Sequence, residues 1–125
     1  EEHLLKSAGS PAADVVKVPH HGSRSSSSPK FVAAVQPRIA VLSVGKGNRY
    51  GHPASEVIRR YREQGAAIFR TDQGGAVTIR MSAAGMDAWQ WSERKLERIR
   101  LTDMSSWRSV ELANSKKLLL RTMGS

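Results

Sequence analysis

The stretch that decides the fold is Val15-Val16-Lys17-Val18-Pro19-His20-His21-Gly22-Ser23, an apolar run that leads into two histidines and a glycine. Its β-branched residues favour a buried strand over residues 15–18. Gly22 permits a sharp turn at the end of that strand. Since imidazole is a common metal ligand, His20 and His21 are candidate ligands for a metal ion. Neighbouring side chains on an extended strand point to opposite faces, so we expect only one of the two to bind the ion directly.

A second histidine stretch, Asn48-Arg49-Tyr50-Gly51-His52-Pro53, follows the next strand-like run, residues 39–44. Because both histidine stretches follow a strand, we expect them at one edge of the same sheet. Two interpretations of His52 remain open. It is either a general acid or phosphate contact near the metal, or a histidine that only caps the helix expected to begin at Pro53.

The remaining apolar spacing and the glycine and proline positions predict an alternation of helices and strands. Helices are expected over residues 4–10, from Pro29 to Pro37 with Ser28 as N-cap, and from Pro53 to about Gln64. Strands are expected over residues 67–70, 76–80 and 86–91, the last two forming a hairpin joined to the preceding strand by a turn at 72–75. This order indicates an α/β fold in which helices cover a sheet.

Three tryptophans, Trp89, Trp91 and Trp107, could stack on nucleic-acid bases. Trp89 and Trp91 share one face of the expected hairpin, which favours core or hairpin packing over stacking on nucleic-acid bases. Asp72 lies beside two glycines and is expected to form a turn and not to bind a metal.

Basic residues dominate the charge. The chain holds 20 Lys and Arg against 11 Asp and Glu, a formal net charge of +9. That balance favours anionic partners such as nucleic acid, phosphorylated substrates or an acidic membrane surface, although a solvated basic surface gives the same count. The bases that bracket the histidine stretches, with no acid among them, are Lys17, Arg24, Lys30, Lys46 and Arg49. A positive field there suits a phosphodiester substrate.

Composition restricts the class of protein further. Cysteine is absent, which excludes disulfides and cysteine-based zinc sites. No run of 18 apolar residues occurs, so the 125 residues are not expected to span a membrane themselves. The start lacks a Met and a signal pattern, so we expect the middle of a longer polypeptide. From Ser92 the pattern weakens, with a charged helix expected over residues 93–101 and a short amphipathic one over residues 111–121.

The stretch from Asp14 to about Ile79 resembles the C-terminal half of the metallo-β-lactamase-like domain of ComEC-type DNA-internalisation competence proteins. The resemblance rests on the two histidine stretches together with residues 25–29, 41–45 and 70–72. It implies an α/β fold that is the C-terminal half of an αββα sandwich, with a poorly patterned basic tail. Residues 1–91 would form the domain part, and residues 92–125 a tail that is partly helical or disordered.

The resemblance also implies a function. Proteins of this family lie in the bacterial inner membrane and serve DNA uptake in transformation, and their soluble domain is expected to be a metal-dependent nuclease or phosphodiesterase acting on incoming DNA. By similarity, His20 and His21 would be metal ligands and His52 a catalytic residue at the substrate edge. The residues expected to contact DNA phosphates are Lys17, Ser23, Arg24, Lys46 and Arg49.

One departure from the family pattern concerns the metal. The HxHxDH signature of the superfamily is absent, since the histidines are His3, His20, His21 and His52. We therefore expect a fragment that binds zinc or manganese weakly or not at all and has little activity alone. Its expected partners are DNA and the rest of its own polypeptide, with no small-molecule cofactor. The alternatives are a non-catalytic module that guides DNA and a phosphodiesterase of a small substrate.

Overall fold

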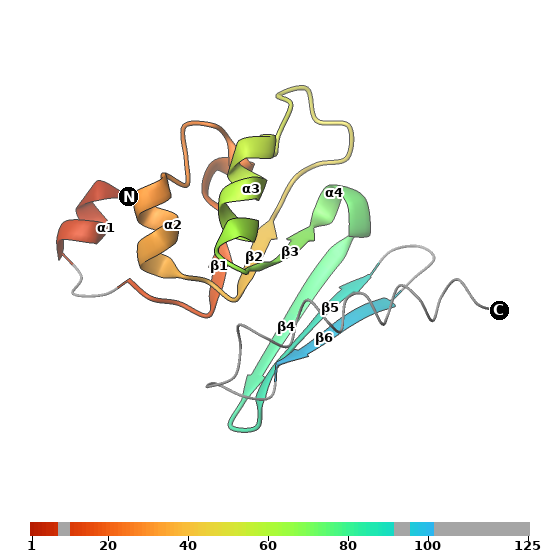
Figure 1. Ribbon diagram of the computed structural model, residues 1–125. Helices are drawn as coiled ribbons and strands as arrows, with labels where there is room; N and C mark the ends of the chain where they lie inside the picture. Colours follow the sequence, from red (N-terminus) through yellow and green to blue (C-terminus); the bar gives the residue numbers. More distant parts are fainter. Residues whose placement is uncertain (8–10, 92–95, 102–125) are drawn as a thin grey trace.

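The described residues form two three-stranded sheets, with the parallel sheet between the helices and the antiparallel sheet (Figure 1). A computed structural model describes residues 1–7, 11–91 and 96–101. The first sheet is parallel, in the order β1 (Val15–Lys17), β2 (Ile39–Leu42) and β3 (Ala67–Arg70). The second is antiparallel, in the order β4 (Ala76–Ser82), β5 (Gly85–Trp91) and β6 (Leu96–Leu101).

Within the described residues, four α-helices and one 3₁₀ helix accompany the strands: α1 (Glu2–Ser7), the short 3₁₀ helix η1 (Pro19–Gly22), α2 (Pro29–Val35), α3 (Ser55–Glu63) and α4 (Thr71–Gly74). Helices η1 and α2 connect β1 to β2, α3 connects β2 to β3, α1 precedes β1, and α4 lies between β3 and β4. Helix α2 begins as its sequence predicts, because the Ser28 hydroxyl accepts a hydrogen bond from the Phe31 N–H at 3.3 Å. Helix α3 buries Val57, Ile58 and Tyr61, whose spacing places them on one face.

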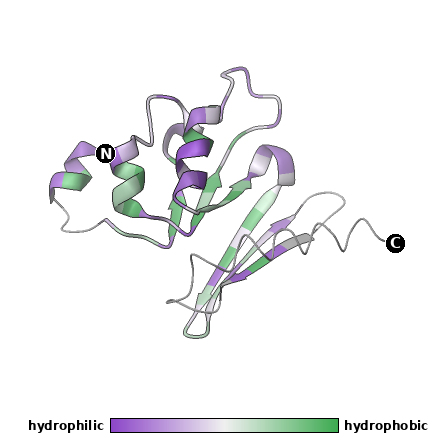
Figure 2. Ribbon diagram, viewed as in Figure 1, coloured by the Kyte–Doolittle hydropathy of each residue, from purple (hydrophilic) through white to green (hydrophobic). Residues whose placement is uncertain are grey.

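The parallel sheet separates two apolar cores. Because side chains alternate along each strand, Ala40 and Leu42 face the first core, together with apolar residues of α2 and α3. Ile39 and Phe69 face the second core, where they pack against residues of the antiparallel sheet such as Ala88. The described residues thus form three layers: helices, parallel sheet and antiparallel sheet. Figure 2 shows hydrophobic residues recurring along the strands of both sheets.

The predicted α/β class is confirmed, and most elements lie where they were expected. The helix predicted over residues 93–101 is wrong for the part that the structure describes, since 96–101 form β6 and pair with β5. The helix predicted from Pro53 begins at Ser55, and the predicted turn after β3 contains the short helix α4. Residues 92–95 and 102–125 lie outside the described residues, as do the remaining predictions for the tail. The four-layer sandwich remains a prediction.

Within the residues that the structure describes, no helix has both the length and the apolar character that crossing a bilayer requires.

Asp87 ties the three antiparallel strands together on their outer face. Its carboxylate accepts hydrogen bonds from Arg100 Nε at 2.9 Å, Arg98 Nη2 at 3.0 Å and Arg80 Nη2 at 3.3 Å. Arg80 belongs to β4, and the other two arginines belong to β6. The hydrogen bond from Arg100, followed by those from Arg98 and Arg80, lowers the pKa of Asp87 from 3.8 to about 2.

We expect this carboxylate to make stability depend on acid pH. A folded-state pKa below the unfolded value gives a stabilisation that is complete above about pH 4 and is lost as the pH falls through about 2. The free energy of unfolding should therefore fall between pH 4 and 2, and Asp87→Asn should make this fall smaller. Urea unfolding from pH 2 to 6 measures both curves, and equal slopes for the two proteins would contradict the prediction.

Candidate active site

The two adjacent histidines lie in a turn and not on a strand. Strand β1 ends at Lys17, and η1 follows from Pro19. His20 and His21 have φ angles of 48° and 56°, in the left-handed region, and Gly22 continues with φ 80°. The prediction that only one histidine could face a metal assumed an extended strand, and that premise is wrong. Both side chains are exposed.

The His21 ring is oriented by the main chain of the loop that follows β2. Its Nδ1 lies 2.6 Å from the carbonyl oxygen of Ser43. A carbonyl oxygen only accepts, so Nδ1 carries the proton, and in the neutral ring the lone pair is on Nε2. Histidines that bind metals usually donate their other ring N–H to such an acceptor. His21 therefore has the arrangement of a metal ligand that binds through Nε2.

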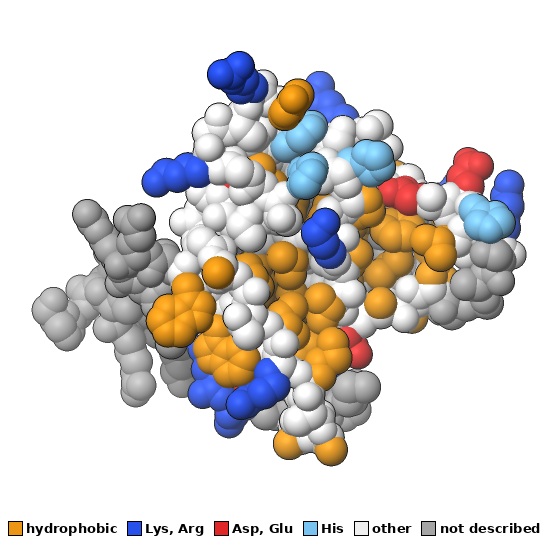
Figure 3. Space-filling view, turned by 180° about the vertical axis from the view of Figure 1, so that it is seen from behind, with side chains coloured by type: hydrophobic (Ala, Val, Ile, Leu, Met, Phe, Trp, Pro, Cys, Tyr) orange, Lys and Arg blue, Asp and Glu red, His pale blue; other side chains and the backbone are white. Residues whose placement is uncertain are grey.

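Gly22 brings the two histidine stretches together. A Cβ built on Gly22 would lie 2.7 Å from Cβ of Pro53 and 2.9 Å from Cδ2 of Leu42, so only glycine fits there. The Ala54 N–H donates to the Gly22 carbonyl at 2.9 Å. Since Gly22 follows His21 and Pro53 follows His52, this contact places both histidine turns at the same end of the parallel sheet. In Figure 3, histidine side chains gather on one face, with Lys and Arg side chains around them.

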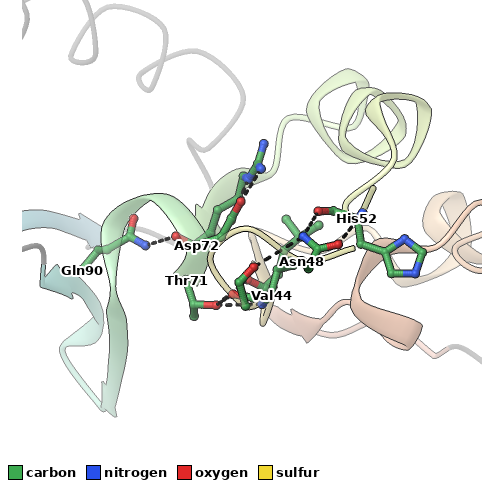
Figure 4. A network of polar contacts seen from close by, with 9 residues as sticks. Val44, Asn48, His52, Thr71, Asp72 and Gln90 are labelled. Carbon is green, nitrogen blue, oxygen red and sulfur yellow. Dashed lines mark hydrogen bonds and ion pairs between the residues drawn. The ribbon is translucent and has the colours of Figure 1, made fainter. Parts of the chain in front are cut away.

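Asn48 closes the second histidine loop (Figure 4). Its side chain donates from Nδ2 to the His52 carbonyl at 2.7 Å and accepts from the His52 N–H at 3.0 Å. The Tyr50 ring stacks on the His52 ring with centroids 5.9 Å apart, and 82% of Tyr50 is exposed. His52 itself is half-buried. Helix α3 begins at Ser55 and its N-cap is Ala54, so His52 lies two residues before the cap.

Thr71 anchors the start of this loop to the end of β3. Its hydroxyl accepts from the Val44 N–H at 2.7 Å and lies 2.8 Å from the Val44 carbonyl, to which it donates (Figure 4). The neighbouring Asp72 accepts two hydrogen bonds from Arg70, which lower its pKa, so it is a structural partner and not a free ligand. Gln90 of β5 donates to the Arg70 carbonyl at 2.6 Å.

Sequence reasoning missed Asn48, Thr71 and Gln90 as organisers of this edge. Asn48 and Thr71 lie within the stretches that carried the family resemblance. The sequence therefore marked both residues but did not show which hydrogen bonds they make. Gln90 had a weaker signal, as a polar residue among the alternating positions of a strand. Gly74 makes room for it, because a Cβ there would overlap the Gln90 side chain.

The predicted phosphate-binding side chains surround the histidine turns along the chain. Lys17, Arg24, Lys46 and Arg49 are exposed, and within the described part of the chain none of them forms an ion pair. The Ser23 hydroxyl is half-buried and lies 3.1 Å from that of Ser25. These cations are available to an anionic ligand.

The imidazoles do not make a complete metal site. Considering only the described residues, no three His, Asp or Glu side chains are placed to hold one ion. Protein zinc sites use three or four protein ligands. The His21 ring has the orientation that one such ligand would need.

We expect Gly22→Ala to destabilise the protein by packing as well as by backbone strain. Gly47→Ala is the matched control, since Gly47 also has positive φ but a Cβ built there would meet nothing within 4 Å. The control should lose about 1 kcal/mol of unfolding free energy, from the left-handed backbone alone. Gly22→Ala should lose about 1–3 kcal/mol more, because Pro53 and Leu42 must move. Urea unfolding measures both, and equal losses would show that the close contact is unimportant.

Asn48→Ala should loosen the second histidine loop. It leaves the half-buried N–H and carbonyl of His52 without their partner, which should lower the free energy of unfolding by about 1–2 kcal/mol. Amide hydrogen exchange at His52 should accelerate in parallel. Gln73→Ala, at an exposed position of α4, is the control and should change stability by less than about 0.5 kcal/mol. Unchanged exchange at His52 in Asn48→Ala would contradict the assignment.

Several known proteins are similar to this chain over part of their length. No protein-family model matches the chain, and no solved structure matches it. ComE operon protein 3 of Bacillus subtilis is 43% identical over 68 residues, which cover 54% of this chain and 9% of that protein. Competence protein ComA of Neisseria gonorrhoeae is 40% identical over 89 residues, covering 70% of this chain and 13% of that protein. Recombination protein 2 of Haemophilus influenzae is 33% identical over 66 residues, covering 53% and 8%.

The chain thus spans between 8% and 13% of the length of these relatives. All of them match across more than half of this chain at 33–43% identity. The metallo-β-lactamase-like half-domain stays a prediction. The resemblance to ComEC-type competence proteins is confirmed, and this chain belongs with them, matching one segment of their length.

Proposed function

We propose that this segment serves DNA uptake as part of a metal-dependent nuclease or phosphodiesterase domain that acts on incoming DNA. The observation that carries the proposal is the His21 ring, whose Nδ1–H is held by the Ser43 carbonyl so that Nε2 is available to a metal. The relative from Neisseria gonorrhoeae is named a competence protein. As the resemblance implies, the parent polypeptide would lie in the bacterial inner membrane.

The chain's own residues would divide the work as follows. His21, with His20 beside it, would hold a zinc or manganese ion, which when bound supplies Lewis-acid activation of a phosphodiester. The four exposed bases, Lys17, Arg24, Lys46 and Arg49, would bind phosphate oxygens and stabilise negative charge that develops there. His52, held through its main chain by Asn48, would contact the substrate or transfer a proton to the leaving oxygen.

The missing ligands would come from the rest of the polypeptide. The described residues do not bring three ligands together, so the proposal requires carboxylates and imidazoles from outside this segment. The same observation favours a second candidate, a segment that guides DNA electrostatically without cutting it. A phosphodiesterase acting on a small substrate would share the metal site but would not need bases spread over the end of β1 and two loops.

The test is nuclease activity of this chain joined to the preceding part of its own polypeptide, assayed on single- and double-stranded DNA with Mn²⁺ or Zn²⁺. His21→Ala should reduce cleavage more than about 100-fold, since even the residues that support metal ligands contribute about 10- to 100-fold. His3→Ala, in α1, is the matched control and should cut like the unmodified protein.

Two results would decide against the enzyme. If the His21→Ala protein still cleaves DNA, this histidine is not a ligand of the catalytic metal. Salt-sensitive DNA binding without any cleavage would favour the guiding segment instead.

A further inference from the structure

The outer face of the antiparallel sheet carries aromatic and basic side chains in one layer. On β5, Met86 and Ala88 point into the core, so alternation places Asp87, Trp89 and Trp91 on the opposite face. Strand register sets arginines beside them. We call this set of residues the Trp–Arg face: Arg80, Asp87, Trp89, Trp91, Arg98 and Arg100. Core or hairpin packing was expected for these two tryptophans; Trp89 packs within the antiparallel sheet against Arg80 and Arg98, and neither ring lies in the core.

Trp89 is held between two arginines, whereas Trp91 is open. The guanidinium carbons of Arg80 and Arg98 lie 5.1 and 5.6 Å from the centroid of the Trp89 ring. Trp91, two residues along the same strand, is 58% exposed. In Figure 3, large hydrophobic side chains lie next to a group of Lys and Arg side chains, on the part of the molecule that holds the antiparallel sheet.

Charge on this face favours an anionic polymer over an apolar protein partner. Three guanidinium groups share the single carboxylate of Asp87, and their side chains remain 44–66% exposed. Covering them with an apolar surface would remove these charges from water without new partners. Phosphate groups would instead supply charge-assisted, bidentate hydrogen bonds to the guanidinium groups.

We propose that the Trp–Arg face binds single-stranded nucleic acid, with a base stacked on Trp91 and phosphates paired with the arginines. Stacking on aromatic rings and guanidinium planes beside a basic groove is how single strands are bound without sequence preference. Trp89 and Trp91 are two residues apart on a strand, so their side chains are about 6.8 Å apart, which is about twice the spacing of stacked bases. A duplex keeps its bases paired and stacked about 3.4 Å apart, so it cannot offer an unstacked base to this face. The site is independent of the histidines and of any metal.

The test is binding of fluorescein-labelled oligomers to the 125-residue chain in EDTA, measured by anisotropy over a range of salt. The probes are dT20, rU20 and a 20-bp DNA duplex. dT20, rU20 or both should bind more tightly than the duplex, and the two single strands show whether the sugar matters. Trp91→Ala should weaken single-strand binding about 5- to 100-fold, while Trp91→Phe should retain most of it. Arg98→Gln should reduce the salt slope by about 0.7.

Two exposed residues off this face provide matched controls. Met81→Ala, on the same hairpin, and Tyr50→Ala, beside His52, remove side chains that are 65% and 82% exposed. Both should bind dT20 like the unmodified chain. Because EDTA removes divalent metal from the assay, single-strand binding there separates this proposal from the metal-dependent one. Circular dichroism confirms that each variant is folded. Equal binding by Trp91→Ala and the unmodified chain, or a duplex bound as tightly as both single strands, would overturn the proposal.

Discussion

The contact between the main chain of Gly22 and the ring of Pro53 is the constraint on which the histidine edge depends. Gly22 lies against both Pro53 and Leu42, with no space for a side chain. The hydrogen bond from the Ala54 N–H to the Gly22 carbonyl fixes the same approach from the main chain. Two turns that are about thirty residues apart in sequence therefore lie together at the end of the parallel sheet, and everything proposed for this edge follows from their meeting.

The sequence predicted the layers well because alternation and helix spacing are local properties. Residues 67–70 form β3 as expected, and Ser28 caps α2. It failed where tertiary contacts decide. The left-handed turn at His20 and His21 is stabilised by partners distant in sequence, such as the Ser43 carbonyl. The charged residues of β6 were expected to form a helix. Instead they form a strand, and Arg98 and Arg100 pair with Asp87 on the neighbouring strand.

The candidate site shows the same division. The order of the motifs along the chain predicted that the two histidine stretches would share one edge of the sheet, and the Gly22–Pro53 contact brings the two turns together. Period-two alternation correctly placed Trp89 and Trp91 on one face but could not say which face is buried. The structure resolves this, because Met86, Ala88 and Gln90 fill the space against the parallel sheet. The supporting roles of Asn48 and Thr71 depend on hydrogen bonds to main-chain atoms, which no spacing rule reveals.

The group that orients His21 belongs to the main chain, and this has an evolutionary consequence. Any residue at position 43 presents the same carbonyl oxygen, so replacement of Ser43 leaves the acceptor in place. Only a change in the path of the chain beyond β2 would remove it. The orientation of the His21 ring is thus inherited with the path of the main chain, and the side chain at position 43 is not what fixes it.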